Sequence, residues 1–408
     1  MKKIFFALVL IALFIACFFI GQNYKHVFYK IHRFNHKPVI SVVLSTYNRD
    51  YGLPVSIESI LNQSFDDFEF IIINDGSTDN TDAVIKAYAK KDPRIIYLKN
   101  DKNMGLIYSL NRGLKVAKGT YIARMDDDDQ SIRDRFARQI QIMEQHPELA
   151  VLGSNIGGAG SKFQVDFDKE PSLIPPEEVE INTYFSSGLA HPTIMIRRDF
   201  LTQNDIWYPT EYLYAEDCGL YRRILDKGGK LSMVREPLLL FRVVKSRPQP
   251  GRGYGTTQSD SFKKLQQEKL MPLIGEVEPE KLGAFAGMEN RCILMKRMAE
   301  ANKEKKIIDQ KTLEAKILNE CPDESGKRWH TVHPYWNDIL IRDGKKISRA
   351  NASDTGTITK ETNESITIKW HLYPAEIFKM DKKNKRLDYV KDESGKVKSY
   401  DDIAPKIK

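Results

Sequence analysis

The stretch VISVVLSTYN, residues 39–48, decides the class of fold. It opens with the run Val39–Leu44, apolar except for Ser41, and ends in the polar residues Ser45–Asn48. A second run, Phe68–Ile73, is apolar except for Glu69 and is likewise followed by polar residues, Asn74–Ser77. Apolar runs without alternation are typical of strands buried on both faces of a parallel sheet. We therefore predict such a sheet, with polar residues at the carboxyl ends of its strands.

Helical patterns alternate with strands up to about residue 155. The predicted helices are Pro54–Leu61, Thr78–Lys90, Met104–Val116 and Ile132–Gln145, and the further strands are Arg94–Leu98, Thr120–Met125 and Ala150–Ser154. Ser131, with Asp134 three residues on, predicts a capping box at the start of the last helix. This order of elements predicts a parallel, right-handed wound sheet.

The rest of the chain suggests four further parts. Residues 155–190 look rich in loops, and they precede a strand at Thr193–Ile196, a helix at Glu216–Leu225 and a strand at Pro237–Val244. A Pro- and Gly-rich stretch closes this α/β domain, predicted to span residues 38–250. We then expect a helical extension at 256–322, a small β module at 329–395 with period-two alternation, and a tail at 396–408. Trp329, Trp336 and Trp370 of the β module can stack on sugar rings or pack a core.

The amino terminus predicts a membrane anchor. Ile4–Ile20 has no charged residue and would form a helix of about 25 Å. We expect a transmembrane helix at residues 1–21 and a basic linker at 22–37. A cleaved signal peptide is the alternative, although no small-x-small cleavage site follows. More basic residues follow the span than precede it, so the positive-inside rule places the rest of the chain in the cytoplasm.

Composition limits the class of protein. Apolar residues make up 41% and charged residues 29%, as in globular proteins. The net charge is +8, but no nucleic-acid-binding motif accompanies it, so we expect no nucleic-acid partner. A nearby anionic membrane surface accounts for the positive charge. The four cysteines, Cys17, Cys218, Cys292 and Cys321, are widely spaced. This spacing predicts neither a disulfide framework nor a zinc site. It indicates that the protein lies in a reducing compartment.

The run Asp126–Asp129 points most directly to chemistry. Four consecutive carboxylates repel one another unless a cation or solvent relieves them. Carboxylate oxygens are the ligands that Mg²⁺ and Mn²⁺ prefer, and such ions bridge diphosphates. Asp126 and Asp128 alternate, so they point to one side of an extended strand end. The sequence predicts a metal site there, and a solvated acidic loop is the alternative.

Two other carboxylates also have two interpretations. Asp75 ends a predicted buried strand, where it can accept a hydrogen bond from a nucleotide base or cap the next helix. Asp217 opens a predicted helix, where it can act as a general base or compensate the charge of the helix terminus.

Together these runs resemble the inverting family 2 glycosyltransferases with the GT-A fold, a Rossmann-like wound mixed sheet, over about residues 38–250. The resemblance is carried by Val42–Asn48, Asn74–Asp79, Asn103–Gly105 with Leu110-Asn111, Ala123–Asp129, His191–Thr193 and Glu216-Asp217. One departure is Val244, where many relatives carry a histidine that can join the metal site. The aliphatic side chain of Val244 cannot ligate a metal.

The resemblance implies a role for each matching residue. Those that would bind the nucleotide sugar are Thr46, Tyr47, Asn48, Asp75, Asn103, Arg124, Asp126 and His191, where His191 can instead be a buried structural histidine. Asp126 and Asp128 would form the DxD site for Mn²⁺ or Mg²⁺, and Asp217 would be the catalytic base.

The expected function is metal-dependent, inverting transfer of a sugar from a nucleotide-diphosphate sugar, in particular a UDP-sugar. The acceptor would be a saccharide or a lipid-linked glycan in cell-surface polysaccharide synthesis. We expect a single-pass protein of the bacterial inner membrane with a cytoplasmic catalytic domain. A sugar nucleotidyltransferase is disfavoured, because residues 45–50 contain no glycine for a phosphate loop. A non-catalytic nucleotide-sugar-binding homologue is the alternative that Val244 leaves open.

Overall fold

The computed structural model describes residues 37–158, 164–242, 254–282 and 287–321, together with the strands of a barrel between residues 328 and 392. The chain forms two compact units, and residues 175–188 and 211–218 belong to the second of them. The predicted anchor, almost all of the linker, the tail and Val244 lie outside the described residues. Among the helices that are described, none is long and apolar enough to span a membrane.

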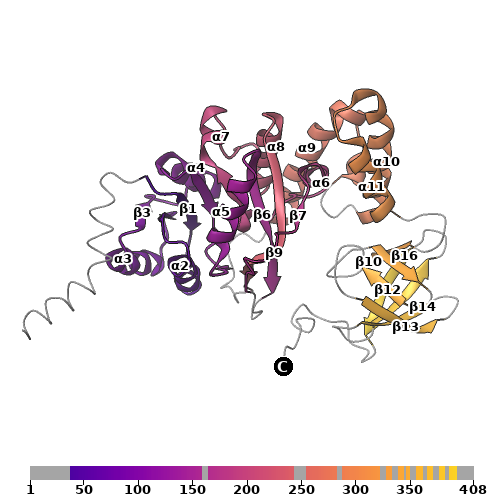
Figure 1. Cartoon of the computed structure of the whole chain (residues 1–408), viewed down its shortest axis with the longest axis horizontal. Coiled ribbons are helices and arrows are strands. Elements are labelled where there is room, and N and C mark those ends of the chain that lie inside the picture. The colour runs from indigo at the N-terminus through magenta and orange to yellow at the C-terminus, as the bar shows by residue number, and fades with distance from the viewer. Residues whose placement is uncertain are drawn as a thin grey trace, which may run out of the picture. The chain divides into compact units, whose positions relative to one another are not determined.

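The described part of the first unit is built on one mixed sheet (Figure 1). Its strands follow the order β3-β2-β1-β4-β8-β6-β9-β5, and β7 pairs with β9. The bounds are β1 Ile40–Thr46, β2 Phe68–Asn74, β3 Ile95–Lys99, β4 Tyr121–Arg124, β5 Gln130–Ser131, β6 Leu149–Gly158, β7 Leu173–Ile174, β8 Met195–Arg197 and β9 Lys230–Phe241. Strands β1 to β4 are parallel, whereas β8 is antiparallel to β4 and β6. The sheet is therefore mixed, as the resemblance implied, while the strands predicted up to residue 155 all run parallel to one another.

Helices cover the sheet because its strands are apolar on both faces. Val42 and Leu44 belong to a core cluster that includes residues of α2 (Leu53–Leu61), α3 (Thr81–Lys91) and α5 (Arg135–Gln145). Val43 faces α4 (Leu106–Val116) instead, where a Cβ on Gly113 would lie 2.6 Å from its Cγ1 atom. Alternate residues of β1 thus serve opposite layers, as expected for a central strand.

The predicted capping box at the start of α5 is wrong. Ser131 lies in β5, which pairs with Leu239 and Leu240 of β9. Its N–H donates to the Ser59 hydroxyl at 3.0 Å, and Asp134, the residue before α5, makes no capping bond with its side chain. Sheet pairing therefore keeps Ser131 extended, four residues before the helix begins at Arg135.

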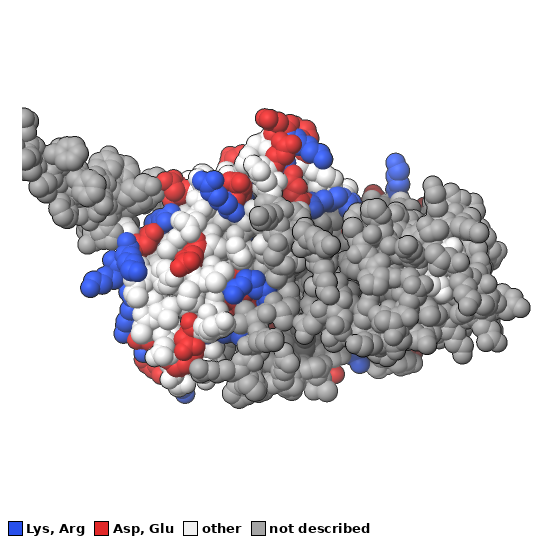
Figure 2. All heavy atoms as spheres, turned by 90° about the horizontal axis from the view of Figure 1, so that it is seen from below, with Lys and Arg blue, Asp and Glu red and all other residues white. Residues whose placement is uncertain are grey.

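The remaining elements of this region are η1 (His191–Thr193), α7 (Arg198–Gln203) and α8 (Glu216–Asp226). Residues 155–190 contain β7 and α6 (Pro176–Thr183) as well as loops, so the loop-rich expectation was incomplete. On the face shown in Figure 2, Lys and Arg are interspersed with Asp and Glu over the described surface. The described residues on that face therefore form no continuous basic surface.

The second unit contains helices and a β barrel. Helices α9 (Tyr254–Ile274), α10 (Gly287–Lys305) and α11 (Gln310–Glu320) contribute to a core that also takes Ile181 from α6. The short helix η2 (Pro279–Lys281) lies between α9 and α10 in the chain. The barrel is closed and contains β10 Arg328–Val332, β11 Ile339–Asp343, β12 Lys346–Arg349, β13 Thr355–Glu361, β14 Ser365–Trp370, β15 Glu376–Asp381 and β16 Arg386–Asp392. It forms where the sequence predicted a β module.

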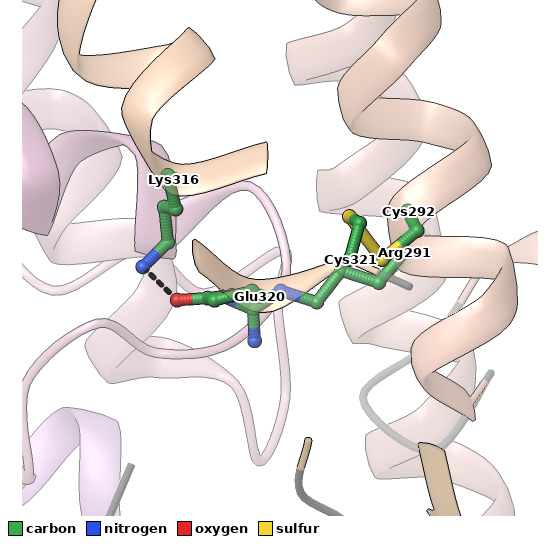
Figure 3. The surroundings of a disulfide bond; sticks show 5 residues. All are labelled: Arg291, Cys292, Lys316, Glu320 and Cys321. Carbon is green, nitrogen blue, oxygen red and sulfur yellow. Dashed lines mark hydrogen bonds and ion pairs between the residues drawn. A yellow bond between two sulfur atoms is a disulfide. The ribbon is translucent and has the colours of Figure 1, made fainter. Parts of the chain in front are cut away.

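Cys292 and Cys321 form a disulfide bond that joins α10 to the end of α11 (Figure 3). Their Cα atoms are 5.6 Å apart although 29 positions separate them in sequence. Beside the bond, Glu320 accepts from Lys316, and its other oxygen lies 3.1 Å from Arg291 (Figure 3). The expectation that the cysteines form no disulfide is therefore wrong for this pair, because helix packing brings together residues that are distant in sequence.

We expect Cys321→Ser to lower the Tm of the protein. The disulfide limits the conformational freedom of the unfolded chain, which stabilises the folded state by about 3.6 kcal/mol for a loop of this length. A reductant should lower the wild-type Tm to a similar value. Thermal unfolding with and without dithiothreitol measures both effects. Cys218→Ser is the control, and it should keep the full response to reductant. An equal Tm for Cys321→Ser and wild type would contradict the stabilising role.

Candidate functional site

The acidic run lies at the carboxyl end of β4. This strand is buried at every position, and the chain leaves it at Arg124 and Met125 to enter Asp126–Asp129. Oxygens of Asp126, Asp128 and Asp129 all lie within 4.8 Å of one another. Three carboxylate oxygens at this spacing can hold one divalent cation. The cluster contains the predicted pair Asp126 and Asp128 and adds Asp129, which the sequence argument had not singled out.

Burial and mutual repulsion act on these carboxyl groups. Burial, with the charge of Asp128, raises the pKa of Asp127 to about 7. Burial, with the charge of Asp126, raises the pKa of Asp128. The same two causes raise the pKa of Asp129 to about 7. Each shift shows that ionisation is unfavourable at this place without further positive charge. The site therefore favours a bound cation on electrostatic grounds.

Arginines from three segments surround the run. Arg124 forms an ion pair with Asp126. The Arg49 guanidinium lies 3.5 Å from an oxygen of Asp127 and 3.4 Å from an oxygen of Asp128. The backbone N–H of Arg242 donates to Asp129 at 3.3 Å. Arg49 and Arg242 were not predicted as site residues, although Arg49 directly follows the polar end of β1.

A buried polar pair on α5 fixes the end of β4. Arg135 is fully buried, and its Nη2 atom donates to the carbonyl oxygens of Arg124 at 2.9 Å and Ile194 at 3.3 Å. Its Nε atom donates to Gln139 at 3.0 Å, and the Gln139 amide donates to Thr193 O at 2.8 Å. Burial, with the charge of Arg124, lowers the pKa of Arg135 to about 9. This pair thus joins β4 to the segment before β8.

The loops after β1 and β2 are tied together by Asn48. Its φ of 54° lies in the left-handed region, which Asn tolerates better than most residues. Its N–H donates to the Ser77 hydroxyl at 3.0 Å, and its Oδ1 accepts from Thr78 N–H at 2.8 Å. Thr46 is buried at the end of β1, whereas Tyr47 is 37% exposed. Asn48 therefore positions the loop that presents the Tyr47 ring.

Asp75 holds the loop before α4. Its buried carboxylate accepts from Asn100 Nδ2 at 2.6 Å, Met104 N–H at 2.9 Å and Gly105 N–H at 2.9 Å. The alternative that Asp75 caps the following helix is wrong, because α3 begins at Thr81 and is preceded by Asn80. The exposed Asn103 lies in the same loop. The structure thus brings these two predicted donor-binding residues together.

His191 is buried in η1, and its Nε2 atom lies 2.8 Å from the Tyr208 hydroxyl. Burial, with the positive charge of Arg124, holds its pKa well below the usual value. The imidazole is therefore neutral at pH 7. The side-chain amide of Asn111 donates to the carbonyl oxygen of Tyr208 at 3.0 Å and accepts from the N–H of Tyr208 at 2.9 Å. These bonds fit both a sugar-facing and a structural role for His191.

Asp217 belongs to the second unit and lies in the first turn of α8. Its Oδ1 atom accepts from the N–H of Cys218 at 2.8 Å. Acidic side chains are stabilising at this end of a helix. The role of Asp217 as the catalytic base stays a prediction.

A polar cavity of about 850 Å³ also lies in the first unit, lined by parts of α2, β5 and the turn before β3. Arg94 lines this cavity, and its guanidinium is paired with Asp92 at 2.8 Å and donates to the carbonyl oxygen of Leu61 at 2.9 Å. The grouped carboxylates that a metal would need lie instead at the acidic run.

Comparisons with known proteins indicate the family of this chain. The family model named Glycosyl transferase family 2 matches residues 41–228. The chain is 31% identical to MJ1057 of Methanocaldococcus jannaschii, an uncharacterized glycosyltransferase, over 51% of this chain and 71% of that protein. It is 28% identical to Escherichia coli WfaP, a UDP-Glc:alpha-D-GlcNAc-diphosphoundecaprenol beta-1,3-glucosyltransferase, over 58% of this chain and 87% of that one. Among solved structures, S. aureus TarS is similar with 16% identity and a TM-score of 0.45, over 86% of this chain and 69% of that one.

The chain therefore belongs to glycosyl transferase family 2, and it is a glycosyltransferase. The resemblance to family 2 glycosyltransferases that was inferred from the motifs is confirmed. The family match ends at residue 228, so the helical extension and the barrel follow it in the chain.

We predict that Asp129→Asn raises the Tm of the metal-free protein. The raised pKa of Asp129 means that folding disfavours its charged form, so stability is lost as pH rises toward and through 7. The gain in Tm should be larger at about pH 8 than at about pH 5.5. Adding Mn²⁺ should stabilise the variant less than wild type. Differential scanning fluorimetry measures all four conditions, and a less stable variant at the higher pH would contradict the argument.

Proposed function

We propose that this glycosyltransferase transfers a sugar from a UDP-sugar with inversion, using Mn²⁺ or Mg²⁺ held by Asp126 and Asp128. The observation that carries the proposal is the three-carboxylate cluster at the end of β4, with guanidinium groups beside it. Carboxylates suit hard divalent ions, and such ions bind diphosphates. The neighbouring Thr46, Tyr47 and Asp75 support a nucleotide next to that site.

The residues of the chain would divide the work of one displacement. When bound, the ion supplies positive charge for the leaving diphosphate. Arg124 would donate hydrogen bonds to the phosphates, because a planar guanidinium matches phosphate oxygens. Asp217 would take the proton from the acceptor hydroxyl as its oxygen attacks the anomeric carbon. A single attack from the face opposite the diphosphate inverts that carbon.

The acceptor is proposed to be a saccharide, in particular a lipid-linked one. The name of WfaP contains both a UDP-sugar donor and a diphosphoundecaprenol-linked acceptor. A lipid-linked acceptor fits the proposed anchor at residues 1–21 and a catalytic domain at the cytoplasmic face of a bacterial inner membrane. We further propose a role in cell-surface polysaccharide synthesis.

The first test of this function is a panel of nucleotide sugars, assayed for release of the nucleoside diphosphate. We expect release from a UDP-sugar that is abolished by chelator and restored by Mn²⁺ or Mg²⁺. Asp128→Ala should lose both turnover and metal-dependent donor binding, because it removes one of the clustered ligands. Lys86→Ala is a matched control, since its exposed side chain pairs with Asp82 on α3. Full activity in excess chelator would rule out the metal site.

The second test concerns the catalytic base. Asp217→Asn keeps the size of the side chain but removes its ability to accept a proton. Turnover should fall by about 10²- to 10⁴-fold, while the affinity for UDP stays near the wild-type value. Steady-state kinetics and calorimetry separate the two quantities. A variant that keeps more than about a tenth of wild-type turnover would exclude Asp217 as the base.

A further inference from the structure

Arg49 is a charged residue that the proposed mechanism does not use. Its guanidinium lies between two neighbouring carboxylates, with Nε 3.5 Å from Asp127 and Nη2 3.4 Å from Asp128. Only 19% of its side chain is exposed, so the group is held against the acidic run rather than extended into solvent. This arrangement partly neutralises two charges that burial makes unfavourable.

The backbone of Arg49 is fixed on both sides. Its N–H donates to the Thr81 hydroxyl at 2.9 Å, and its carbonyl oxygen accepts from Leu53 N–H at 3.1 Å, which opens α2. The preceding residue, Asn48, is tied to the loop after β2. A change in the position of the guanidinium therefore needs only rotation about side-chain bonds.

The two partners of Arg49 differ in one respect. Asp128 belongs to the set of carboxylates that can share one cation, whereas Asp127 does not. A divalent ion at Asp128 and the guanidinium of Arg49 carry like charge and compete for the same oxygens. Asp127 has no such conflict, so it can remain a partner of Arg49 in either state.

We propose that Arg49 is an exchangeable counter-cation of this site. Without metal, its guanidinium pairs with the carboxylate of Asp128. When a divalent ion binds Asp128, the guanidinium of Arg49 turns to the diphosphate of the donor. The exchange rests on the proposed metal and donor site. It gives Arg49 a place in donor binding, because a guanidinium can bind two phosphate oxygens at once. It also makes binding of metal alone weaker than binding of metal together with a diphosphate.

The test compares Arg49→Ala with wild type in two titrations at about pH 8.5, above the raised carboxyl pKa values. With MnCl₂ alone, the variant should bind about tenfold more tightly, because a competing positive charge is gone. With UDP in saturating Mn²⁺, it should bind about tenfold more weakly, because a phosphate contact is gone. Arg133→Ala removes the same charge from an exposed side chain and should change neither value.

Arg49→Lys keeps the charge but not the two-pronged geometry. Its affinity for MnCl₂ alone should return toward wild type, whereas its affinity for UDP should be only partly restored. An unchanged Mn²⁺ affinity in Arg49→Ala, or an unchanged UDP affinity, would overturn the exchange. A wild-type protein that binds UDP but no Mn²⁺ would overturn the metal site itself, and the exchange with it. Circular dichroism of each variant shows that the fold is retained.

Discussion

The structure around the site depends on one electrostatic constraint, the grouping of carboxylates at the end of a buried strand. Asp127 and Asp129 have pKa values raised to about 7, so their charged forms are unfavourable without a cation. Neighbouring elements respond to that constraint. Arg124 and Arg49 lie against the run, and Arg242 donates a backbone N–H to it. Placing the run in this position costs stability, and a divalent ion bound at the proposed site would offset that cost.

Rigid polar contacts hold the run in position. Arg135 and Gln139 are both fully buried, and they bond backbone oxygens of β4, of β6 and of the segment before β8. A fully buried charged side chain is costly unless it is well bonded, so this pair makes the geometry of the strand end specific. Asp75 and Asn48 do the same for the loops that follow β1 and β2. These loops therefore reach a donor with little freedom to lose on binding.

The sequence predicted what depends on local pattern. The apolar runs at β1 and β2 became buried parallel strands, and the polar ends of β1, β2 and β4 met at one edge, because parallel strands end on the same side. The mixed character of the sheet followed from the family resemblance and not from β8 itself, since a three-residue strand has no pattern that shows which neighbour it pairs with. The disulfide between Cys292 and Cys321 was missed because helix packing, not spacing, brings the two together. Arg135 was missed because an arginine on an amphipathic helix usually faces solvent, and only tertiary structure reveals that this one is buried.

Asp129 is an additional candidate ligand in a chain that has a valine at position 244. Relatives with a histidine near the end of the last strand can add a nitrogen ligand there, which Val244 cannot provide. In this chain Asp129 places a third carboxylate oxygen within 4.8 Å of those of Asp126 and Asp128. The N–H of Arg242, two residues before Val244, donates to that carboxylate. A third carboxylate adds one negative charge to the proposed site. That site would bind a hard ion such as Mg²⁺ or Mn²⁺ through oxygens alone, and it would have greater need of the positive charge that Arg49 and Arg124 supply.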